Sequence, residues 1–377
     1  MSTPSVIASI ESGIERGLHI GAQVVASIGG TVVTDLAIGT AREGVSMAPG
    51  TLMPWFSGSK PVTATAVLQM VERGRLGLDD QVASHLPACG VGGKQDITVR
   101  HLLLHTAGFR DPGLTPSQLR AASWDESMAA ICASPLEPGW VPGETAGYHP
   151  LTSYQVLGAL VQLQDLEGRA FVDYVAEEIF EPCDMADSWM SLSADRYRSY
   201  GDRMAVPIGV DRGEQRIIGA LSGPDAYEPV FPGGGAVGPM GDLVRFYEML
   251  LGGGERAGHR VLGSAMAADM VRPHRVGAHD LTFRSVLDWG LGVMTNSWKY
   301  QQKPGWYGYG DHAGDDAFGH GGVGTLVSFA DPQHRLAVAL AFNGQLAEAA
   351  NHARTQPVIN ALYDDLGLSE SASTQRS

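Results

Sequence analysis

The chain of 377 residues is 44% hydrophobic and 18% charged, which is typical of a folded globular protein with more than one ordinary core. Its net charge of −15 argues against polyanionic partners, so neither nucleic acid nor a membrane surface is expected as a partner. The three cysteines, Cys89, Cys132 and Cys183, have no metal-site spacing and predict a reducing compartment without a disulfide framework.

The first residues of the chain contain neither a basic segment nor an apolar core followed by a cleavage site, so we expect no secretion signal. No apolar run approaches the ~18 residues that are needed to span a bilayer. The sequence therefore predicts a cytoplasmic protein.

The N-terminal part predicts one helix and one β-hairpin. Val6, Ile10 and Ile14 repeat at helical spacing and indicate an amphipathic helix. Two apolar runs, residues 23–28 and 31–38, are joined by a pair of glycines. Glycine adopts the positive φ of a tight turn without steric cost, so the two runs are expected to pair as antiparallel strands.

Ser57 stands three residues before Lys60, just ahead of a segment in which apolar residues repeat at helical spacing. A separation of three puts both side chains on one helix face and within reach of each other. A serine hydroxyl becomes a nucleophile when a neighbouring base takes its proton, and a desolvated lysine is such a base. The helix N-terminus adds free amides where negative charge develops. The alternative is an N-capping serine beside a solvated lysine.

The stretch from residue 76 to residue 264 has mostly helical apolar spacing. Thr98 is predicted to cap a short helix, and Gly108 suits the C-terminal end of that helix. His105, at the same helix end, is expected to be a packing or capping group. Further helices are predicted at residues 154–161 and 171–179, and another is predicted from Asp242 to Leu250.

Strand character returns late in the chain, at residues 289–294, 324–329 and 336–342, and a last helix is predicted around residues 349–362. Strands near both ends with helices between them imply an α/β fold. Its mixed sheet of antiparallel strands would be completed by both termini, flanked by terminal helices, and interrupted by an inserted helical lobe. The predicted parts are an α/β domain of residues 1–75 and 265–368, a mostly helical lobe of residues 76–264, and a disordered tail of residues 369–377.

Two further segments carry residues that suit acyl chemistry. Tyr148 precedes a predicted helix, and a cationic lysine nearby is expected to lower its pKa below the reference value of ~10. Tyr148 would then take the Ser57 proton and return it to a leaving group; the alternative is a half-buried core tyrosine. His320, Gly321 and Gly322 open a strand whose glycines allow close approach of a substrate, and an amide there could complete an oxyanion hole. The alternative is an ordinary glycine-rich turn.

Together these motifs resemble a known family. The order Ser57-x-x-Lys60, then Tyr148, then His320-Gly-Gly is similar to that of the serine β-lactamase and penicillin-binding-protein superfamily. The closest branch is that of the class C β-lactamase-like family VIII carboxylesterases. The resemblance covers residues 5–365 and implies a β-lactamase-like fold.

The resemblance also implies roles for single residues. Ser57 would be the nucleophile, with Lys60 and Tyr148 as its activating pair. The Ser57 and Val323 amides would form the oxyanion hole.

Two departures from the superfamily pattern bear on the substrate. Penicillin-recognising members usually have an asparagine two residues after the tyrosine, where this chain has Pro150 without a side-chain amide. They have Lys-Thr-Gly in place of His320-Gly-Gly, and a histidine is expected to be only part-charged near neutrality. β-lactamase and D-aminopeptidase activities are therefore less expected than ester hydrolysis.

The remaining candidates for the pocket are aromatic residues and a second histidine. Trp306, Tyr307 and Tyr309 form either an aromatic wall for an apolar acyl group or a surface loop that packs on itself. His149, beside the candidate tyrosine, is taken as a further substrate-binding residue, as are His320 and its two following glycines.

Two other patterns are not expected to bind a cofactor or metal. Gly233, Gly235 and Gly238 match a dinucleotide-binding pattern, but no strand-to-helix unit surrounds them, so a loop that lines the site is expected. The acidic and histidine residues between 312 and 320 match no zinc spacing. We therefore expect neither a metal nor a cofactor.

The sequence thus predicts a serine acyl-enzyme hydrolase, in first place a carboxylesterase that acts on small-molecule esters. One alternative is a transacylase or amide-forming enzyme that passes the acyl group from a small-molecule ester or amide to an amine or alcohol. A second alternative is a catalytically inactive binding module, which the joint presence of Ser57, Lys60 and Tyr148 argues against.

Overall fold

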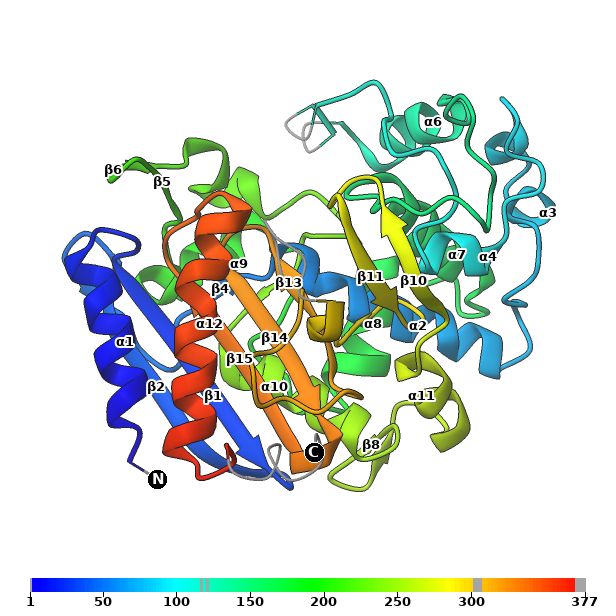
Figure 1. The fold of residues 1–377 in the computed structure, drawn as a ribbon. Helices are drawn as coiled ribbons and strands as arrows, with labels where there is room; N and C mark the ends of the chain where they lie inside the picture. The colour runs from blue at the N-terminus through cyan, green and yellow to red at the C-terminus, as the bar shows by residue number, and fades with distance from the viewer. Residues whose placement is uncertain (1, 116–117, 120–121, 301–306, 370–377) are drawn as a thin grey trace.

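The computed structural model describes residues 2–369 except 116–117, 120–121 and 301–306. Within this part of the chain a nine-stranded sheet has helices on both faces (Figure 1). Each neighbouring pair of its strands runs antiparallel, in the order β10-β11-β12-β13-β14-β15-β1-β2-β3. The strands are β1 (Gly21–Ile28), β2 (Thr31–Arg42), β3 (Val45–Ser46), β10 (Arg275–Asp280), β11 (Ser285–Trp289), β12 (Met294–Thr295), β13 (Phe318–Gly322), β14 (Leu326–Asp331) and β15 (Leu336–Phe342).

The two ends of the chain meet in this sheet, where β1 pairs with β15 and places Val24 opposite Leu340. Every residue of β15 is buried, because helices cover both faces of the sheet. Helices α1 (Pro4–Glu15) and α12 (Glu348–Asp365) lie side by side on one face, and α10 (Met240–Leu251) packs on the other (Figure 1). The predicted α/β fold, with a sheet completed by both termini, is confirmed.

The β1–β2 hairpin is also confirmed. Gly29 and Gly30 have φ angles of 57° and 82°, and a two-residue turn with two positive φ angles matches the twist of the paired strands. β2 extends beyond the predicted end of the strand, to Arg42.

In the described residues, the segment from 76 to 264 contributes no strand to the large sheet. Its predicted helices at residues 154–161 and 171–179 are present, the second continuing as a π-helical segment (Ala176–Phe180). Besides α10, the described α-helices of this segment and the two that flank it are α2 (Lys60–Glu72), α3 (Val82–His85), α4 (Val99–Leu103), α6 (Trp124–Ala133), α7 (Thr152–Gln164), α8 (Phe171–Val175), α9 (Ala194–Tyr200) and α11 (Ser264–Val271). Short strand pairs join β4 (Met53–Pro54) to β7 (Val237–Gly238), β5 (Ile208–Asp211) to β6 (Glu214–Ile217), and β8 (Glu255–Arg256) to β9 (His259–Arg260).

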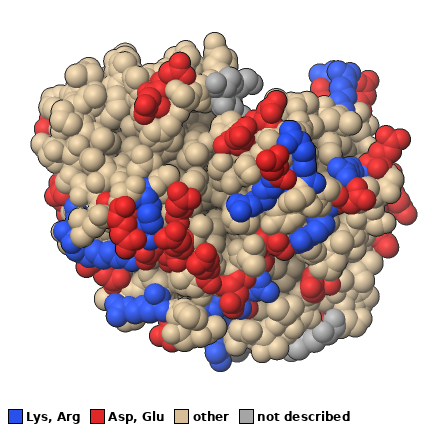
Figure 2. Space-filling view, turned by 180° about the vertical axis from the view of Figure 1, so that it is seen from behind, with Lys and Arg blue, Asp and Glu red and all other residues tan. Residues whose placement is uncertain are grey.

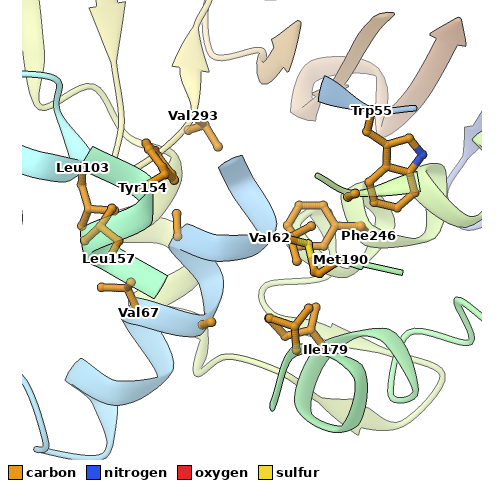
Figure 3. Packing of buried hydrophobic residues seen from close by; sticks show 14 of the residues in the cluster. Trp55, Val62, Val67, Leu103, Tyr154, Leu157, Ile179, Met190, Phe246 and Val293 are labelled. Atoms are coloured by element: carbon orange, nitrogen blue, oxygen red, sulfur yellow. The ribbon is translucent and has the colours of Figure 1, made fainter. Parts of the chain in front are cut away.

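Helix α2 is buried on almost every side, as expected of a helix with apolar residues all round. Figure 3 shows Val67 on the side of Leu157 from α7 and Val62 on the side of Phe246 from α10. α2 therefore packs against several helices at once, and this packing fixes the start of the helix, where Lys60 lies.

Two predicted boundaries are wrong. The strand predicted over residues 289–294 is the end of β11, a bend and the start of β12, in which Gly292 has a φ of 88°. Asp242 lies in the first turn of α10 and not at its N-cap, which is Pro239. The Asp242 carboxylate instead accepts hydrogen bonds from the Ser188 hydroxyl and the Asp187 amide.

The end of α4 differs in detail from the prediction. Thr98 caps the helix by accepting a hydrogen bond from the His101 amide, as predicted. The residue that leaves the helix in the left-handed conformation is His105, with a φ of 57°, and Gly108 follows in the next turn with a φ of 86°. His105 is fully buried, and its Nδ1 accepts a hydrogen bond from the His149 amide.

The prediction for the cysteines is wrong. Cys89 and Cys132 form a disulfide across 43 residues, while Cys183 is free and buried. Helix α6 brings Cys132 against the 3₁₀ turn that carries Cys89, a tertiary contact that cysteine spacing alone does not reveal. The argument from cysteine usage for a reducing compartment therefore fails.

The described surface carries charges of both signs. On the face drawn in Figure 2, basic side chains lie beside acidic ones rather than gathering in one continuous patch among the described residues. None of the described helices combines the length and apolar character that crossing a membrane requires. Apart from Ser369, the predicted tail lies outside the described residues.

Candidate active site

Ser57 lies in a 3₁₀ turn (Phe56–Ser59) that leads directly into α2. Phe56 has a φ of 48°, an uncommon conformation for an aromatic residue that costs free energy and recurs at functional sites. The Ser59 hydroxyl stabilises this turn, because it donates to the Phe56 carbonyl at 2.6 Å and accepts from the Ala236 amide at 3.0 Å. The turn holds the Ser57 side chain at the wall of a cavity.

Lys60 is fully buried and lies beside the serine. Its Nζ is 3.3 Å from Ser57 Oγ, 2.7 Å from the Gly233 carbonyl oxygen and 3.2 Å from the Pro150 carbonyl oxygen. Each of these three neighbours is a neutral oxygen that can accept a hydrogen bond. Burial lowers the pKa of Lys60 to about 7, so a substantial fraction of the amine is neutral near pH 7 and able to accept a proton.

Tyr148 approaches the serine from the other side and donates a hydrogen bond from its hydroxyl to Ser57 Oγ at 2.6 Å. Its ring packs against His105 and Phe283, with centroids 4.6 and 4.8 Å away. Lys60 Nζ lies 5.0 Å from the centroid of the same ring. The structure thus brings the three residues of the predicted catalytic set into direct contact.

The expected lowering of the Tyr148 pKa is wrong. Burial raises this pKa above its ordinary value, and the hydrogen bond with Ser57 offsets only part of that effect. Lys60 gives little help to a phenolate, because the same burial lowers its own pKa and reduces its positive charge near neutrality. Tyr148 therefore stays protonated and acts as a donor, and Lys60 is the group suited to be the base.

Asp280 holds the tyrosine in place and was missed by the sequence analysis. It is fully buried, and its Oδ1 accepts hydrogen bonds from the amides of Tyr148, Thr282 and Phe283, each at 3.0 Å. Its Oδ2 accepts from Arg275 at 3.0 Å. The bonds to the second and third following amides are typical of an aspartate in a turn, which the sequence could have suggested. Nothing local points to the distant tyrosine.

The His320 ring lies in the cavity wall with 2% of its surface exposed. Nδ1 donates to the Gly321 carbonyl at 2.7 Å, and Nε2 has no hydrogen-bond partner among the described residues. Burial, with the nearby Lys60, lowers the pKa of His320 to about 3. The expected partial charge near neutrality is therefore wrong, and His320 presents a neutral ring to the cavity.

The glycines after this histidine allow β13 to approach the serine turn. A Cβ atom on Gly322 would lie 2.4 Å from the Trp55 carbonyl oxygen, closer than atoms can pack. On the opposite side, a Cβ on Gly58 would lie 2.4 Å from Leu326. The same approach places Val323, with 53% of its surface exposed, in the wall of the cavity that also contains Ser57.

The cavity beside the serine has a volume of about 440 Å³ and a largely apolar lining. Tyr307, Tyr309, Gly321, Gly322 and His320 all line it, as the sequence predicted for the pocket. The lining also includes residues that the sequence analysis missed, among them Phe231, Phe283, Met294 and the α12 residues Glu348, Asn351, His352, Thr355 and Gln356.

Two predicted pocket residues have a different outcome. His149 is fully buried behind Tyr148, away from the cavity lining, and its Nε2 accepts hydrogen bonds from the Gly108 and Phe109 amides. It supports the backbone and does not reach a substrate, so that prediction is wrong. Trp306 lies outside the described residues.

The predicted glycine loop borders the cavity. Gly233 lines it and accepts the hydrogen bond from Lys60, as expected of a loop at the site.

Across the described ranges, no group of three or more His, Cys, Asp or Glu side chains could hold a metal ion.

The Beta-lactamase family model matches residues 7–361, nearly the whole chain. The chain belongs to the Beta-lactamase family. This membership confirms the resemblance seen in the sequence and places the chain among serine hydrolases of the β-lactamase-like fold.

Relatives of this Beta-lactamase family member include esterases and penicillin-binding proteins. The esterase EstB of Burkholderia gladioli is 27% identical over 97% of this chain and 96% of its own length. A penicillin-binding-protein homologue of known structure from Caulobacter crescentus is 27% identical, with a TM-score of 0.76 over 96% of this chain and 97% of its own. A family VIII carboxylesterase structure, 24% identical, shares the fold with a TM-score of 0.77 over 96% of this chain and 97% of its own.

Proposed function

We propose that this protein is a carboxylesterase that cleaves small-molecule esters through an acyl-enzyme on Ser57. The observation that carries the proposal is that the Ser57 hydroxyl contacts both Lys60 and Tyr148. Ser57 Oγ lies 3.3 Å from a lysine amine whose burial favours its neutral form and 2.6 Å from a protonated tyrosine. A serine with a base on one side and a proton donor on the other has what acyl transfer requires.

In the first half-reaction Ser57 Oγ attacks the ester carbonyl while its proton passes to the neutral Lys60 amine. The amides of Ser57 and Val323 are proposed to donate hydrogen bonds to the developing oxyanion. Collapse of the tetrahedral intermediate breaks the bond to the leaving oxygen. The Tyr148 hydroxyl gives that oxygen a proton and recovers one from the Lys60 ammonium.

In the second half-reaction water attacks the acyl-enzyme with the same groups in reversed roles. The water proton passes to Lys60, the bond between the acyl carbon and Ser57 Oγ breaks, and the serine regains its proton. The carboxylic acid product then leaves the cavity. EstB, which matches nearly the full length of this chain, is an esterase, and this relationship supports an ester as the substrate.

A fluorophosphonate probe tests this proposal directly. We expect the probe to phosphonylate Ser57 in the wild-type protein, as read by mass spectrometry of the peptide that contains it, and expect no adduct in Ser57→Ala. Hydrolysis of p-nitrophenyl acetate should be lost in the same variant while its unfolding midpoint stays unchanged. Ester turnover near the wild-type rate in Ser57→Ala would overturn the proposal.

Acyl transfer to an alcohol or amine is a second candidate, and the apolar lining of the cavity favours it. An apolar wall lowers the local availability of water, so an organic acceptor competes better for the acyl-enzyme than it does in solution. The ratio of transfer product to acid, measured with added alcohol or amine, distinguishes the two reactions.

A further inference from the structure

Glu348 is the first residue of α12 and lies where this helix borders the active-site cavity. It is the one Asp, Glu, Lys or Arg among the described residues that line the cavity. Its side chain is 45% exposed, so it keeps contact with solvent while facing the space that a substrate occupies. The described lining is therefore mostly apolar, and its single fixed charge is negative.

A row of rings connects Glu348 to the catalytic tyrosine. Phe283 packs on Tyr148 with centroids 4.8 Å apart, and Tyr307 packs on Phe283 at the same distance. The His352 ring meets Tyr307 edge-on at 4.9 Å, and His352 Nε2 donates to Glu348 Oε1 at 3.2 Å. This aromatic row forms a continuous wall from the reacting hydroxyl to the carboxylate.

The combination of aromatic rings and a carboxylate is the chemistry that binds an organic cation. An ammonium group gains from the electron-rich ring faces and from the negative charge, and its alkyl groups gain from the apolar surface. A substrate carboxylate would meet only the repulsion of Glu348 from the described lining. The net charge of −15 adds long-range attraction for a cationic molecule.

The carboxylate also acts on the tyrosines of this wall. Burial is the main cause of the raised pKa of both Tyr148 and Tyr307, and the negative charge of Glu348 adds to it in each case. Its field therefore extends along the row as far as the tyrosine that contacts Ser57.

We infer that Glu348 and the aromatic row bind a cationic group in the leaving part of the substrate, which makes esters of amino alcohols the preferred class. The leaving part is assigned to this wall because the wall begins at Tyr148, the residue proposed to protonate the leaving oxygen. The inference rests on the proposed esterase function and specifies its substrate.

Acetylcholine, the acetate ester of choline, and 3,3-dimethylbutyl acetate provide the test. The two esters differ only in a positively charged nitrogen in place of a neutral carbon. At pH 8 and low salt, we expect wild-type kcat/KM to favour the choline ester roughly three- to tenfold. Added salt should reduce this ratio, because the carboxylate is partly exposed.

The ratio of the two kcat/KM values should fall towards one in Glu348→Gln, mainly through a higher KM for the choline ester. Glu11→Gln is the matched control, because it removes the same charge from the exposed face of α1, and it should leave the ratio unchanged. A wild-type ratio near one, or a ratio that Glu348→Gln does not change, would overturn the inference. So would a preference that appears only when the ammonium group is placed in the acyl part.

Binding to Ser57→Ala separates this inference from the proposed function. Calorimetry on that variant should give tighter binding of acetylcholine than of the neutral ester, and the difference should disappear when Glu348→Gln is added. If the wild-type protein hydrolyses both esters equally and Ser57→Ala binds them equally, the inference fails and the esterase function stands. If neither ester is hydrolysed but the charge preference in binding is present, the esterase function fails and the cation site stands.

Discussion

Asp280 Oδ1 accepts a hydrogen bond from the Tyr148 backbone amide at 3.0 Å, although 132 residues separate the two. A second bond, from the Thr282 hydroxyl to the Tyr148 carbonyl oxygen at 2.9 Å, holds the same residue from the other side. The tyrosine is thus fixed through its backbone to the end of β10, and its hydroxyl position at Ser57 depends on that attachment.

Asp280→Asn should therefore affect both stability and catalysis. The variant leaves Arg275 buried without its carboxylate partner, and loss of one member of a buried pair costs about 3 kcal/mol of unfolding free energy. A displaced Tyr148 hydroxyl should also lower kcat about tenfold at temperatures well below unfolding, with little change in KM. Denaturant titration and steady-state kinetics on a p-nitrophenyl ester measure the two effects.

Asp242→Asn is the matched control for this prediction, since it also removes a buried carboxylate paired with an arginine but lies away from the cavity lining. It should destabilise the protein without lowering kcat. Equal kcat values for Asp280→Asn and Asp242→Asn would show that Asp280 has a structural role alone.

Lys60→Ala should abolish ester turnover nearly as completely as Ser57→Ala, by about a thousandfold or more in kcat, because residues that activate one nucleophile act as a unit. The double variant should be no worse than either single variant. Removal of a buried amine whose hydrogen-bond acceptors are all neutral oxygens also relieves its desolvation. The unfolding midpoint should therefore fall less than the cavity left by the missing side chain would suggest. Retention of most activity in Lys60→Ala would mean that Tyr148 activates the serine unaided.

The parts of the fold that the sequence predicts well are those controlled by local rules. Two adjacent glycines specify the hairpin turn at residues 29–30, and the apolar run of β15 specifies a strand buried on both faces. The spacing of Ser57 and Lys60 places both in one helical turn whatever surrounds them. The boundaries between the α/β domain and the helical lobe, placed at residues 75/76 and 264/265, by contrast remain predictions.

The rest depends on contacts between distant segments. The partnership of Asp280 with Tyr148 and the disulfide between Cys89 and Cys132 arise only after the chain folds. The pKa of Tyr148 has the opposite direction from the one predicted for the same reason, because burial is not visible in the sequence. Nearness to a lysine indicates a lowered tyrosine pKa only when that lysine is charged.

Penicillins and cephalosporins should be poor substrates. Their carboxylate has no cation to meet in the described cavity lining, where Glu348 is the only permanent charge, and Pro150 offers no side-chain amide to the acylamino group. We expect kcat/KM for nitrocefin at least a hundredfold below that for a short p-nitrophenyl ester. A nitrocefin value of ~10⁴ M⁻¹s⁻¹ or above, in the ordinary range of enzymes, would contradict this.

The pH dependence of neutral-ester hydrolysis should have one rising limb, with its midpoint at the Lys60 pKa of about 7. Lys60 works as a base only when neutral, so activity is lost below this pH and complete above it, while Tyr148 stays protonated throughout because burial raises its pKa. His320, with a pKa lowered to about 3, should add no step near pH 6.5, and the limb should keep its position in His320→Gln. Profiles of kcat/KM between pH 5 and 9 measure this. A midpoint near 10 would assign the limb to an unshifted lysine or tyrosine, and a step near 6.5 that His320→Gln removes would show that His320 carries charge.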